Sequence, residues 1–119
     1  MHCYKDLTVW KLSVSLATAI YNVTKKFPDI ERYGITSQLR RCVVSISSNI
    51  AEGAGRSGDK EFRYFLNIAY GSSYELETQI IISKNLKYLS SAEHNLIMND
   101  LIKIQKMLYR LIKSQDHKS

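Results

Sequence analysis

The scarcity of helix-breaking residues is the feature that most limits what this chain can fold into. Its 119 residues include one proline, Pro28, and five glycines, three of which fall within residues 53–58. Proline costs about 3 kcal/mol and glycine about 1 kcal/mol inside a helix, so the long stretches between these positions are free to be helical. Apolar residues recur there at alternating three- and four-residue steps, the period of an amphipathic helix. The sequence therefore predicts an all-α protein.

Local stop and start signals divide the chain into four helical segments. Pro28 ends the first, because the residue before a proline is pushed out of the helical region. Gly34 suits the following turn, and Thr36 is placed to cap the second segment with its hydroxyl. Ser90 and Glu93 have the spacing of a capping box, which opens the fourth segment. We expect helices over residues 6–27, 36–54, 58–87 and 91–114.

Each segment has an apolar face, and four such faces predict one shared core. Connections of roughly 3 to 8 residues are typical of antiparallel neighbours in a bundle. The sequence therefore predicts a single domain over residues 1–119, an antiparallel up-and-down four-helix bundle. The expected core residues are Leu7, Trp10, Val14, Ala17, Tyr21 and Val23 or Thr24 in the first helix, Leu39, Val43, Ile46, Ile50 and Gly53 in the second, Phe62, Phe65, Leu66, Ala69, Leu76, Ile80 and Ser83 in the third, and Ile97, Leu101, Ile104, Leu108 and Leu111 in the fourth.

Composition excludes several classes of protein. At 45% hydrophobic residues the chain is too apolar to be disordered, and no apolar run approaches the roughly 18 to 20 residues of a membrane span. The N-terminal sequence lacks the basic and apolar segments of a secretory signal, so we expect a cytoplasmic protein. Cys3 and Cys42 are then expected to be free thiols, because the cytosol is reducing.

No sequence motif points to catalysis or to a bound cofactor. The histidines at positions 2, 94 and 117 have no spacing that would gather them around a metal ion. Residues 53–58 match the dinucleotide-binding pattern G-x-G-x-x-G, but that pattern requires a strand before its turn, and here a helix precedes it. A helix-to-helix turn is expected instead, with an anion held by its amides as the alternative. We expect no enzyme activity, cofactor, metal or small-molecule substrate.

The second helix has a face of small polar residues opposite its apolar face. A helix that faces solvent rarely carries serine, asparagine and cysteine there, because these residues are weaker helix formers than lysine or glutamate. In one interpretation they allow another helix to approach closely, within the bundle or in a neighbouring subunit; in the other they line a binding cleft. The expected buried polar or interface residues are Gln38, Ser45, Asn49 and Glu52 on this helix, beside Cys42, with Ser72 and Glu75 on the third.

Basic residues outnumber acidic ones by 17 to 11, and they gather in two places. On the fourth helix they follow three- and four-residue spacing, with Asp100 as the only acid between Glu93 and Asp116. Such a stripe either is a solvated outer face or binds phosphates with weak, salt-dependent affinity. Tyr109 could stack on a base beside it. The candidate nucleic-acid-binding residues are Arg32, Arg40, Arg41, Arg56, Lys60 and Arg63 around the second helix, and Lys103, Lys106, Arg110 and Lys113 on the fourth.

Several spaced motifs resemble one known family. They are residues 4–11 (YKDLTVWK), residues 33–41 (YGITSQLRR), residues 44–53 (VSISSNIAEG), and the third-helix positions Phe62, Phe65, Leu66 and 75–78 (ELET). In order and content they resemble the four-helix-bundle proteins encoded in intervening sequences of bacterial 23S rRNA genes. The resemblance covers roughly residues 4–88, and the fourth helix matches only in kind.

This resemblance implies a four-helix bundle that assembles into a ring, typically a pentamer, and that has no established enzyme activity. A relative by fold is the accessory protein of diversity-generating retroelements, a basic pentamer that binds nucleic acid. The family's motif residues carry only a structural or binding expectation here; they are Trp10, Gln38, Arg40, Arg41, Ser45, Asn49, Glu52, Gly53 and Glu75.

The functional hypothesis from the sequence is a non-catalytic homo-oligomer with general affinity for RNA or DNA. Its basic balance, the fourth-helix stripe and the family likeness support it. The alternative is a protein-interaction or structural scaffold without nucleic acid, in which the polar face and apolar positions expected to be exposed, such as Ile81, Ile82 and Ile112, serve subunit and partner contacts.

Overall fold

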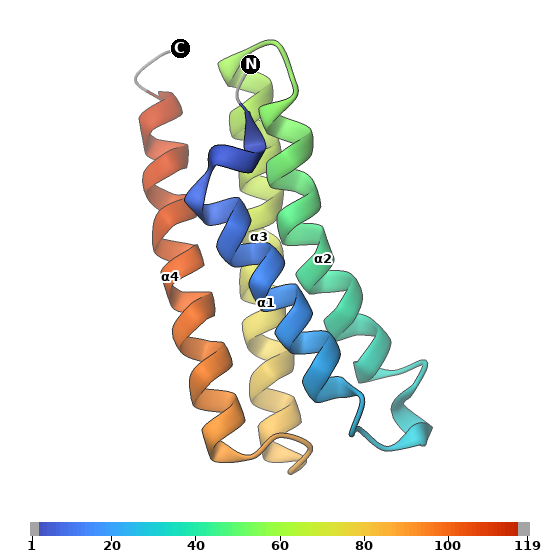
Figure 1. Cartoon of the computed structure of the whole chain (residues 1–119). Helices are drawn as coiled ribbons and strands as arrows, with labels where there is room; N and C mark the ends of the chain where they lie inside the picture. Colours follow the sequence, from blue (N-terminus) through green and yellow to red (C-terminus); the bar gives the residue numbers. More distant parts are fainter. Residues whose placement is uncertain (1–2, 117–119) are drawn as a thin grey trace.

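Four long helices account for most of the computed structural model, which describes residues 3–116. They are α1 (Thr8–Thr24), α2 (Ile35–Ala54), α3 (Asp59–Asn85) and α4 (Ser91–Asp116), with short 3-10 helices η1 (Tyr4–Asp6) and η2 (Asp29–Glu31). Successive helices run in opposite directions, and α4 returns to lie beside α1 (Figure 1). Contacts join each helix to its sequence neighbours and α1 to α4, which closes the bundle. The predicted antiparallel four-helix bundle is confirmed.

The bundle is an elongated body measuring 46 × 23 × 20 Å. Its up-and-down topology brings the start of α1, the α2–α3 turn and the end of α4 to one end, which we call the Gly53 end. The α1–α2 and α3–α4 connections lie at the other end, the Pro28 end (Figure 1). Within residues 3–116, no helix is both long and apolar enough to cross a membrane.

Helix α1 is shorter than the predicted 6–27 at both ends. Leu7 is extended, with φ −76° and ψ 121°, and separates η1 from α1. At the other end, the Thr24 hydroxyl donates to Ile20 O at 2.7 Å, and the amides of Lys26 and Phe27 bond three residues back. These three-residue bonds end the α-helix at Thr24, four residues before Pro28, which has no amide hydrogen to donate to Thr24 O.

The start of α2 is stabilised differently from the prediction. Thr36 does not cap the helix, because α2 begins at Ile35 with Gly34 as its N-cap. Thr36 is the second residue of α2, and its side chain is buried. Glu31 takes the capping role, since its Oε1 accepts from Ile35 N at 3.4 Å. The same carboxylate accepts from the Tyr88 hydroxyl at 2.9 Å, which raises the pKa of Tyr88 and ties the two connections of the Pro28 end together.

The predicted capping box at the start of α4 is confirmed. Glu93 N donates to Ser90 Oγ at 3.1 Å, and Ser90 N donates to Glu93 Oε1 at 3.0 Å. Lys26, just beyond α1, forms an ion pair with Glu93. The bond from Lys26 lowers the pKa of the Glu93 carboxyl below its ordinary value of 4.5, and the Ser90 amide adds to the effect.

The other boundaries lie within three residues of the predicted ones. Helix α3 ends at Asn85, two residues early, because Lys87 takes a left-handed φ of 65° in the turn that follows. Helix α3 begins one residue later than predicted, with Gly58 as its N-cap.

The core contains the apolar stripes predicted for α2 and α4 and most of that for α3, but the stripe predicted for α1 is only partly buried: Thr24 is buried, and Leu7, Trp10 and Ala17 pack against the edge of the core. Val14 and Tyr21 are 38% and 41% exposed, and the buried face of α1 lies one position away. That face includes Ser13 and Thr24, whose hydroxyls donate to carbonyls four residues back and so need no water. The buried residues of α1 are Val9, Ser13, Leu16, Ile20 and Thr24. Ile112, expected to be exposed, is 9% exposed and completes the α4 stripe.

Gly53 sets the spacing between α2 and α3. A Cβ added at this position would lie 2.8 Å from Phe65 Cβ and 3.1 Å from Phe62 Cδ1. No side chain fits there without movement, so glycine is required for the close approach of the two helices. The glycine cluster therefore makes a tight helix-to-helix turn, as predicted.

The polar bonds that tie α1 to the rest of the bundle lie at its C-terminal end. Arg40 of α2 donates from Nε to Thr24 Oγ1 at 2.9 Å, and the ion pair between Lys26 and Glu93 lies just beyond. Among the described residues, the N-terminal half of α1 is held to its neighbours by side-chain packing alone, through Val9, Trp10 and others.

Candidate nucleic-acid interface

The small polar residues of α2 face α3 inside the bundle. The Cys42 thiol donates to Ser72 O at 3.1 Å, and the hydroxyls of Ser45 and Ser72 lie 3.1 Å apart. Asn49 Nδ2 donates to Ser45 O at 2.8 Å. Ser45, Asn49 and Ser72 are half-buried. These contacts support the first interpretation, in which small side chains let two helices of one bundle approach closely.

The structure corrects the burial expected for the remaining residues of that face. Gln38, Glu52 and Glu75 are exposed on the single chain. Glu52 forms a solvent-exposed ion pair with Arg56 at 3.5 Å, one helical turn away. These side chains lie at the edges of the α2–α3 contact, where long side chains reach water, so their removal should cost little in folding. Their place in a subunit interface stays a prediction.

Cys42 is not equipped to act as a nucleophile. Burial first, and then the neighbouring Glu75 carboxylate, raise the pKa of its thiol from 9.0 to about 12. The thiol therefore stays protonated at neutral pH, and the thiolate is the reactive form. Within residues 3–116, no three His, Cys, Asp or Glu side chains gather in a way that could hold a metal ion.

The basic residues predicted around α2 do not form one patch. Arg32, Arg40 and Arg41 lie near the Pro28 end, whereas Arg56 and Lys60 lie at the Gly53 end, with the length of α2 between the two groups. Arg32, Arg41 and Lys60 are exposed.

Two arginines of this set have structural contacts. Arg40 is half-buried, bonds to Thr24 and lies over the Tyr21 ring at 4.7 Å from its centroid. Arg63 donates to Gln115 O at 3.4 Å and so joins the start of α3 to the end of α4. Their guanidinium groups hold helices together, which leaves less of each cation for a ligand.

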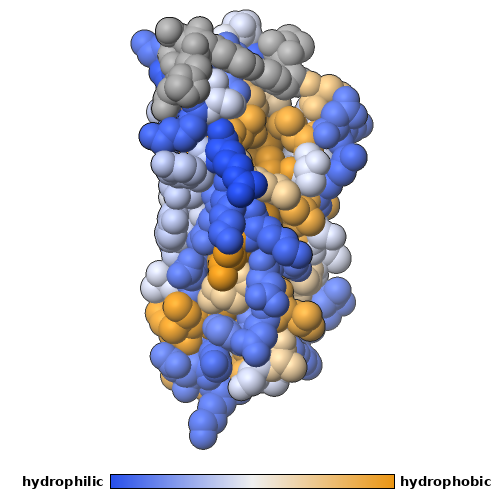
Figure 2. Space-filling view, turned by 90° about the vertical axis from the view of Figure 1, so that its left-hand side faces the viewer, coloured by the Kyte–Doolittle hydropathy of each residue, from blue (hydrophilic) through white to orange (hydrophobic). Residues whose placement is uncertain are grey.

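The four basic residues of α4 form a continuous exposed row, which we call the basic stripe: Lys103, Lys106, Arg110 and Lys113. Steps of three, four and three residues keep them on the outward face of the helix. None of them forms an ion pair with an acid within the described residues. Figure 2, which faces the α4 side of the molecule, shows a hydrophilic band down the middle of this surface. This is the largest set of unpaired cations that the predicted residues provide.

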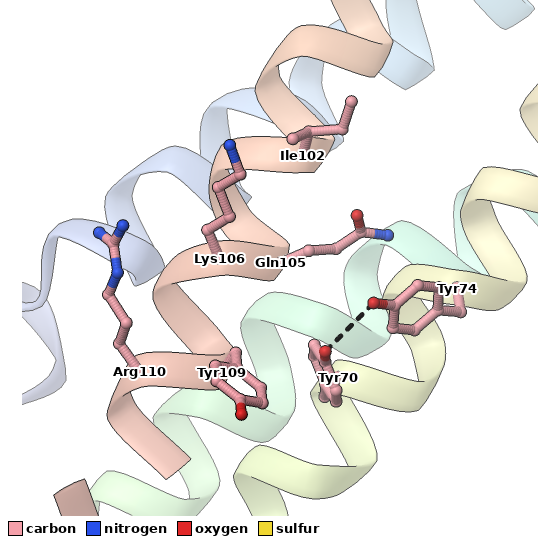
Figure 3. A pocket seen from close by; sticks show the side chains of 7 residues that line it. All are labelled: Tyr70, Tyr74, Ile102, Gln105, Lys106, Tyr109 and Arg110. Carbon is pink, nitrogen blue, oxygen red and sulfur yellow. Dashed lines mark hydrogen bonds between the residues drawn. The ribbon is translucent and has the colours of Figure 1, made fainter. Parts of the chain in front are cut away.

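A hollow of about 430 Å³ lies beside the basic stripe, between α3 and α4. We call it the tyrosine hollow. Tyr70 and Tyr74 line it from α3, with their hydroxyls 3.1 Å apart (Figure 3). From α4 it is lined by Ile102, Gln105, Lys106, Tyr109 and Arg110.

The aromatic rings of the hollow are arranged at angles to one another. Tyr70 and Tyr74 pack edge to face with centroids 5.1 Å apart, and Tyr109 lies 6.4 Å from Tyr70 with a 46° tilt. The hydrogen bond to Tyr74 raises the pKa of Tyr70, so its hydroxyl stays neutral. The Lys113 ammonium lies 5.5 Å from the centroid of the Tyr109 ring. The basic stripe and the hollow thus share Lys106 and Arg110, and cations border a surface of exposed rings.

Comparisons with known proteins identify the family of this four-helix chain. The family description "23S rRNA-intervening sequence protein" matches residues 5–110. The chain belongs to this family. The match extends through most of α4, further than the motifs at residues 4–88 suggest, and it includes three of the four residues of the basic stripe.

A solved structure of similar fold supports the same family. It is a protein of unknown function from the S23 ribosomal protein family of Bacteroides thetaiotaomicron, 27% identical, with a TM-score of 0.82 over 88% of this chain and 95% of that one. No curated protein matches. The family match and this structural likeness agree on the four-helix fold.

Sequence reasoning identified Tyr109 but missed Tyr70 and Tyr74. The signal was present, because a four-residue step places both rings on one face of α3. Nothing in the sequence, however, shows that this face lies beside the polar side of α4, since that depends on how the two helices rotate against each other.

Proposed function

We propose that this member of the 23S rRNA-intervening sequence protein family binds RNA or DNA without catalysis and without reading sequence, through the basic stripe. The observation that supports this most is the row of four exposed cations on one face of α4, from Lys103 to Lys113, with no ion-pair partner among the described residues. Counterions released when such a row meets phosphates favour binding.

The location of the basic stripe determines which of the other basic residues can contact the same nucleic acid. Lys60 lies at the same Gly53 end as Arg110 and Lys113, whereas Arg56 at that end is paired with Glu52. Arg32 and Arg41 lie towards the other end of a 46 Å body and are less suited to the same phosphates.

We further propose that the protein is a homo-oligomer, with the pentamer that the family resemblance implies as the expected form. Five copies of a chain with net charge +6 carry +30 in formal charge, so weak contacts add together. Light scattering coupled to size-exclusion chromatography tests the assembly: a single peak at the monomer mass of 13.7 kDa would contradict it.

Salt-dependent binding to a structured 23S rRNA fragment tests the proposed function. The key variant replaces Lys103, Lys106, Arg110 and Lys113 with glutamine. If all four meet phosphates, the slope of log affinity against log salt falls in magnitude by roughly 3 to 4 on duplex RNA. A matched variant with Lys25, Arg32, Lys84 and Lys87 changed to glutamine removes equal charge at the Pro28 end and should change the slope little. Equal effects of the two variants, or no binding by the wild type at micromolar concentration, would refute the proposal.

The alternative function is a protein-interaction scaffold, and one observation favours it. Ile81, Ile82 and Leu86 near the end of α3 are 42%, 43% and 50% exposed. Replacing them with serine should abolish partner or subunit contacts while leaving nucleic-acid affinity intact, if these residues serve a scaffold. Unchanged assembly in this variant would count against that use.

A further inference from the structure

We propose that the tyrosine hollow takes one unpaired nucleobase of a bound nucleic acid, with its flanking phosphates on Lys106 and Arg110. The inference rests on the proposed function and adds a preference to it: single-stranded segments, loops and bulges should bind better than duplex. The feature that carries it is the joining of exposed aromatic rings and unpaired cations in one hollow of about 430 Å³.

The aromatic side of the hollow offers a stacking surface. Tyr109 is 50% exposed and Tyr74 is 48% exposed, although both belong to a residue type that packs readily. The tilt of Tyr109 against Tyr70 leaves the two rings unstacked on each other. Every base has a π-face, so stacking on tyrosine tolerates any sequence, as the proposed function requires.

The Lys113 ammonium lies over the Tyr109 ring, 5.5 Å from its centroid. An exposed contact of this kind is weak, and lysine has a long flexible side chain. A base can therefore replace the ammonium on the ring. Lys113 can then move to a phosphate of the same strand.

The cationic side of the hollow suits the phosphates of that nucleotide. Lys106 and Arg110 are one helical turn apart on α4, and their side chains extend on the same side of the hollow (Figure 3). Backbone phosphates flank each base in a strand, so a row of cations beside a stacking surface matches the arrangement in one nucleotide.

The floor of the hollow is polar, and its side chain is hydrogen-bonded. Gln105 is 8% exposed, and its Nε2 donates to Glu77 Oε1 at 2.8 Å and to Ser73 O at 3.5 Å. The linked hydroxyls of Tyr70 and Tyr74 lie on the opposite wall. Amide and hydroxyl groups of this kind can bond to the edge of a base. The bases of a duplex are stacked inside the helix, so only an unpaired base can enter.

Fluorescence anisotropy with labelled oligonucleotides tests the inference. The probes are a 12-nucleotide single-stranded RNA and a blunt RNA duplex of the same length. The variants are Tyr109→Ala, which removes the stacking ring, Tyr109→Phe, which keeps it, and Tyr64→Ala as the control. Tyr64 is 62% exposed on α3 and lies outside the hollow.

The expected result is a loss of affinity for the single strand and not for the duplex. Tyr109→Ala weakens binding of the single strand by roughly 5- to 150-fold, the range for one lost base–aromatic stack, and changes duplex binding by less than about twofold. Tyr109→Phe and Tyr64→Ala bind both probes like the wild type. Cross-linking of a 4-thiouridine-substituted strand, mapped by mass spectrometry, should label residues of the hollow.

The opposing results separate the two proposals. If Tyr109→Ala binds both probes as tightly as the wild type, or loses the same affinity for both, the nucleobase site is overturned and the basic stripe remains the binding surface. Binding of a free mononucleotide as tightly as the strand would show a small-molecule site instead and would also overturn it. Failure of the wild type to bind either probe overturns the proposed function, and with it the inference.

Discussion

Replacing Gly53 with alanine should destabilise the bundle, although alanine is the better helix former. The new methyl carbon would lie 2.8 Å from Phe65 Cβ and 3.3 Å from Phe62 O. Both atoms are fixed to the backbone of α3, so no side-chain rotation relieves the contact and the two helices must move apart.

The expected size of the effect follows from two opposing terms. Overpacking of this kind costs about 1 to 3 kcal/mol, and contacts with backbone-anchored atoms favour the upper half of that range. The gain in helix propensity from glycine to alanine offsets about 1 kcal/mol. We therefore expect the free energy of unfolding to fall by about 1 to 2 kcal/mol.

Gly71→Ala is the matched control. Gly71 also lies within a helix, is exposed, and would place its new Cβ with no atom within 4 Å. Only the propensity term applies there, so this variant should gain up to about 1 kcal/mol. Urea denaturation of both variants at one protein concentration gives the comparison. The close-approach argument would be refuted if Gly53→Ala were as stable as Gly71→Ala.

Three further predictions test other contacts. At pH 8 in the folded protein, a maleimide should modify the exposed Cys3 and spare Cys42, whose thiol is buried with a raised pKa; modification of both at similar rates, read by mass spectrometry, would contradict this. The lowered pKa of Glu93 gives stability that is present above pH 4.5 and is lost as pH falls through the lowered value. Glu93→Gln can keep the capping bonds but has no carboxyl to protonate. Its urea midpoint should therefore fall less than that of the wild type between pH 6 and pH 3. Arg40→Gln should cost about 1 to 2 kcal/mol in thermal or urea unfolding through its bond to Thr24, whereas the exposed Arg41→Gln should stay within about 0.5 kcal/mol; equal effects would argue against the structural role of Arg40.

The sequence predicted the parts of the fold that depend on local signals. The capping box at Ser90 and Glu93, the apolar face of α2 and the glycine turn were all visible, because each is set by residues close together in the chain. The face of α1 was misplaced by one position because Ser13 looks polar in the sequence, whereas Val14 and Tyr21 look apolar; the structure buries Ser13 together with the predicted Thr24. Their backbone hydrogen bonds make them suitable for a core.

The candidate site was harder to predict, because it depends on contacts between helices. The basic stripe follows from spacing along α4 alone and was predicted as a row. The structural role of Arg40 depends on where α1 ends, and the partnership of Tyr70 with Tyr109 depends on the rotation of α3 against α4. Neither the end of α1 nor the rotation of α3 against α4 can be predicted from residues close together in the chain.

The uneven attachment of α1 has a consequence for local unfolding. With 17 residues it is the shortest of the four long helices, and its polar ties lie at its C-terminal end. Amide hydrogens in its first two turns should exchange with solvent before those of α2 and α3, through an opening that leaves the other three helices together. Such an opening swings α1 about its Thr24 end and uncovers the apolar side of α4 at Met107 and Leu111, so a protease or the α1 of a neighbouring copy gains access to this seam when it opens.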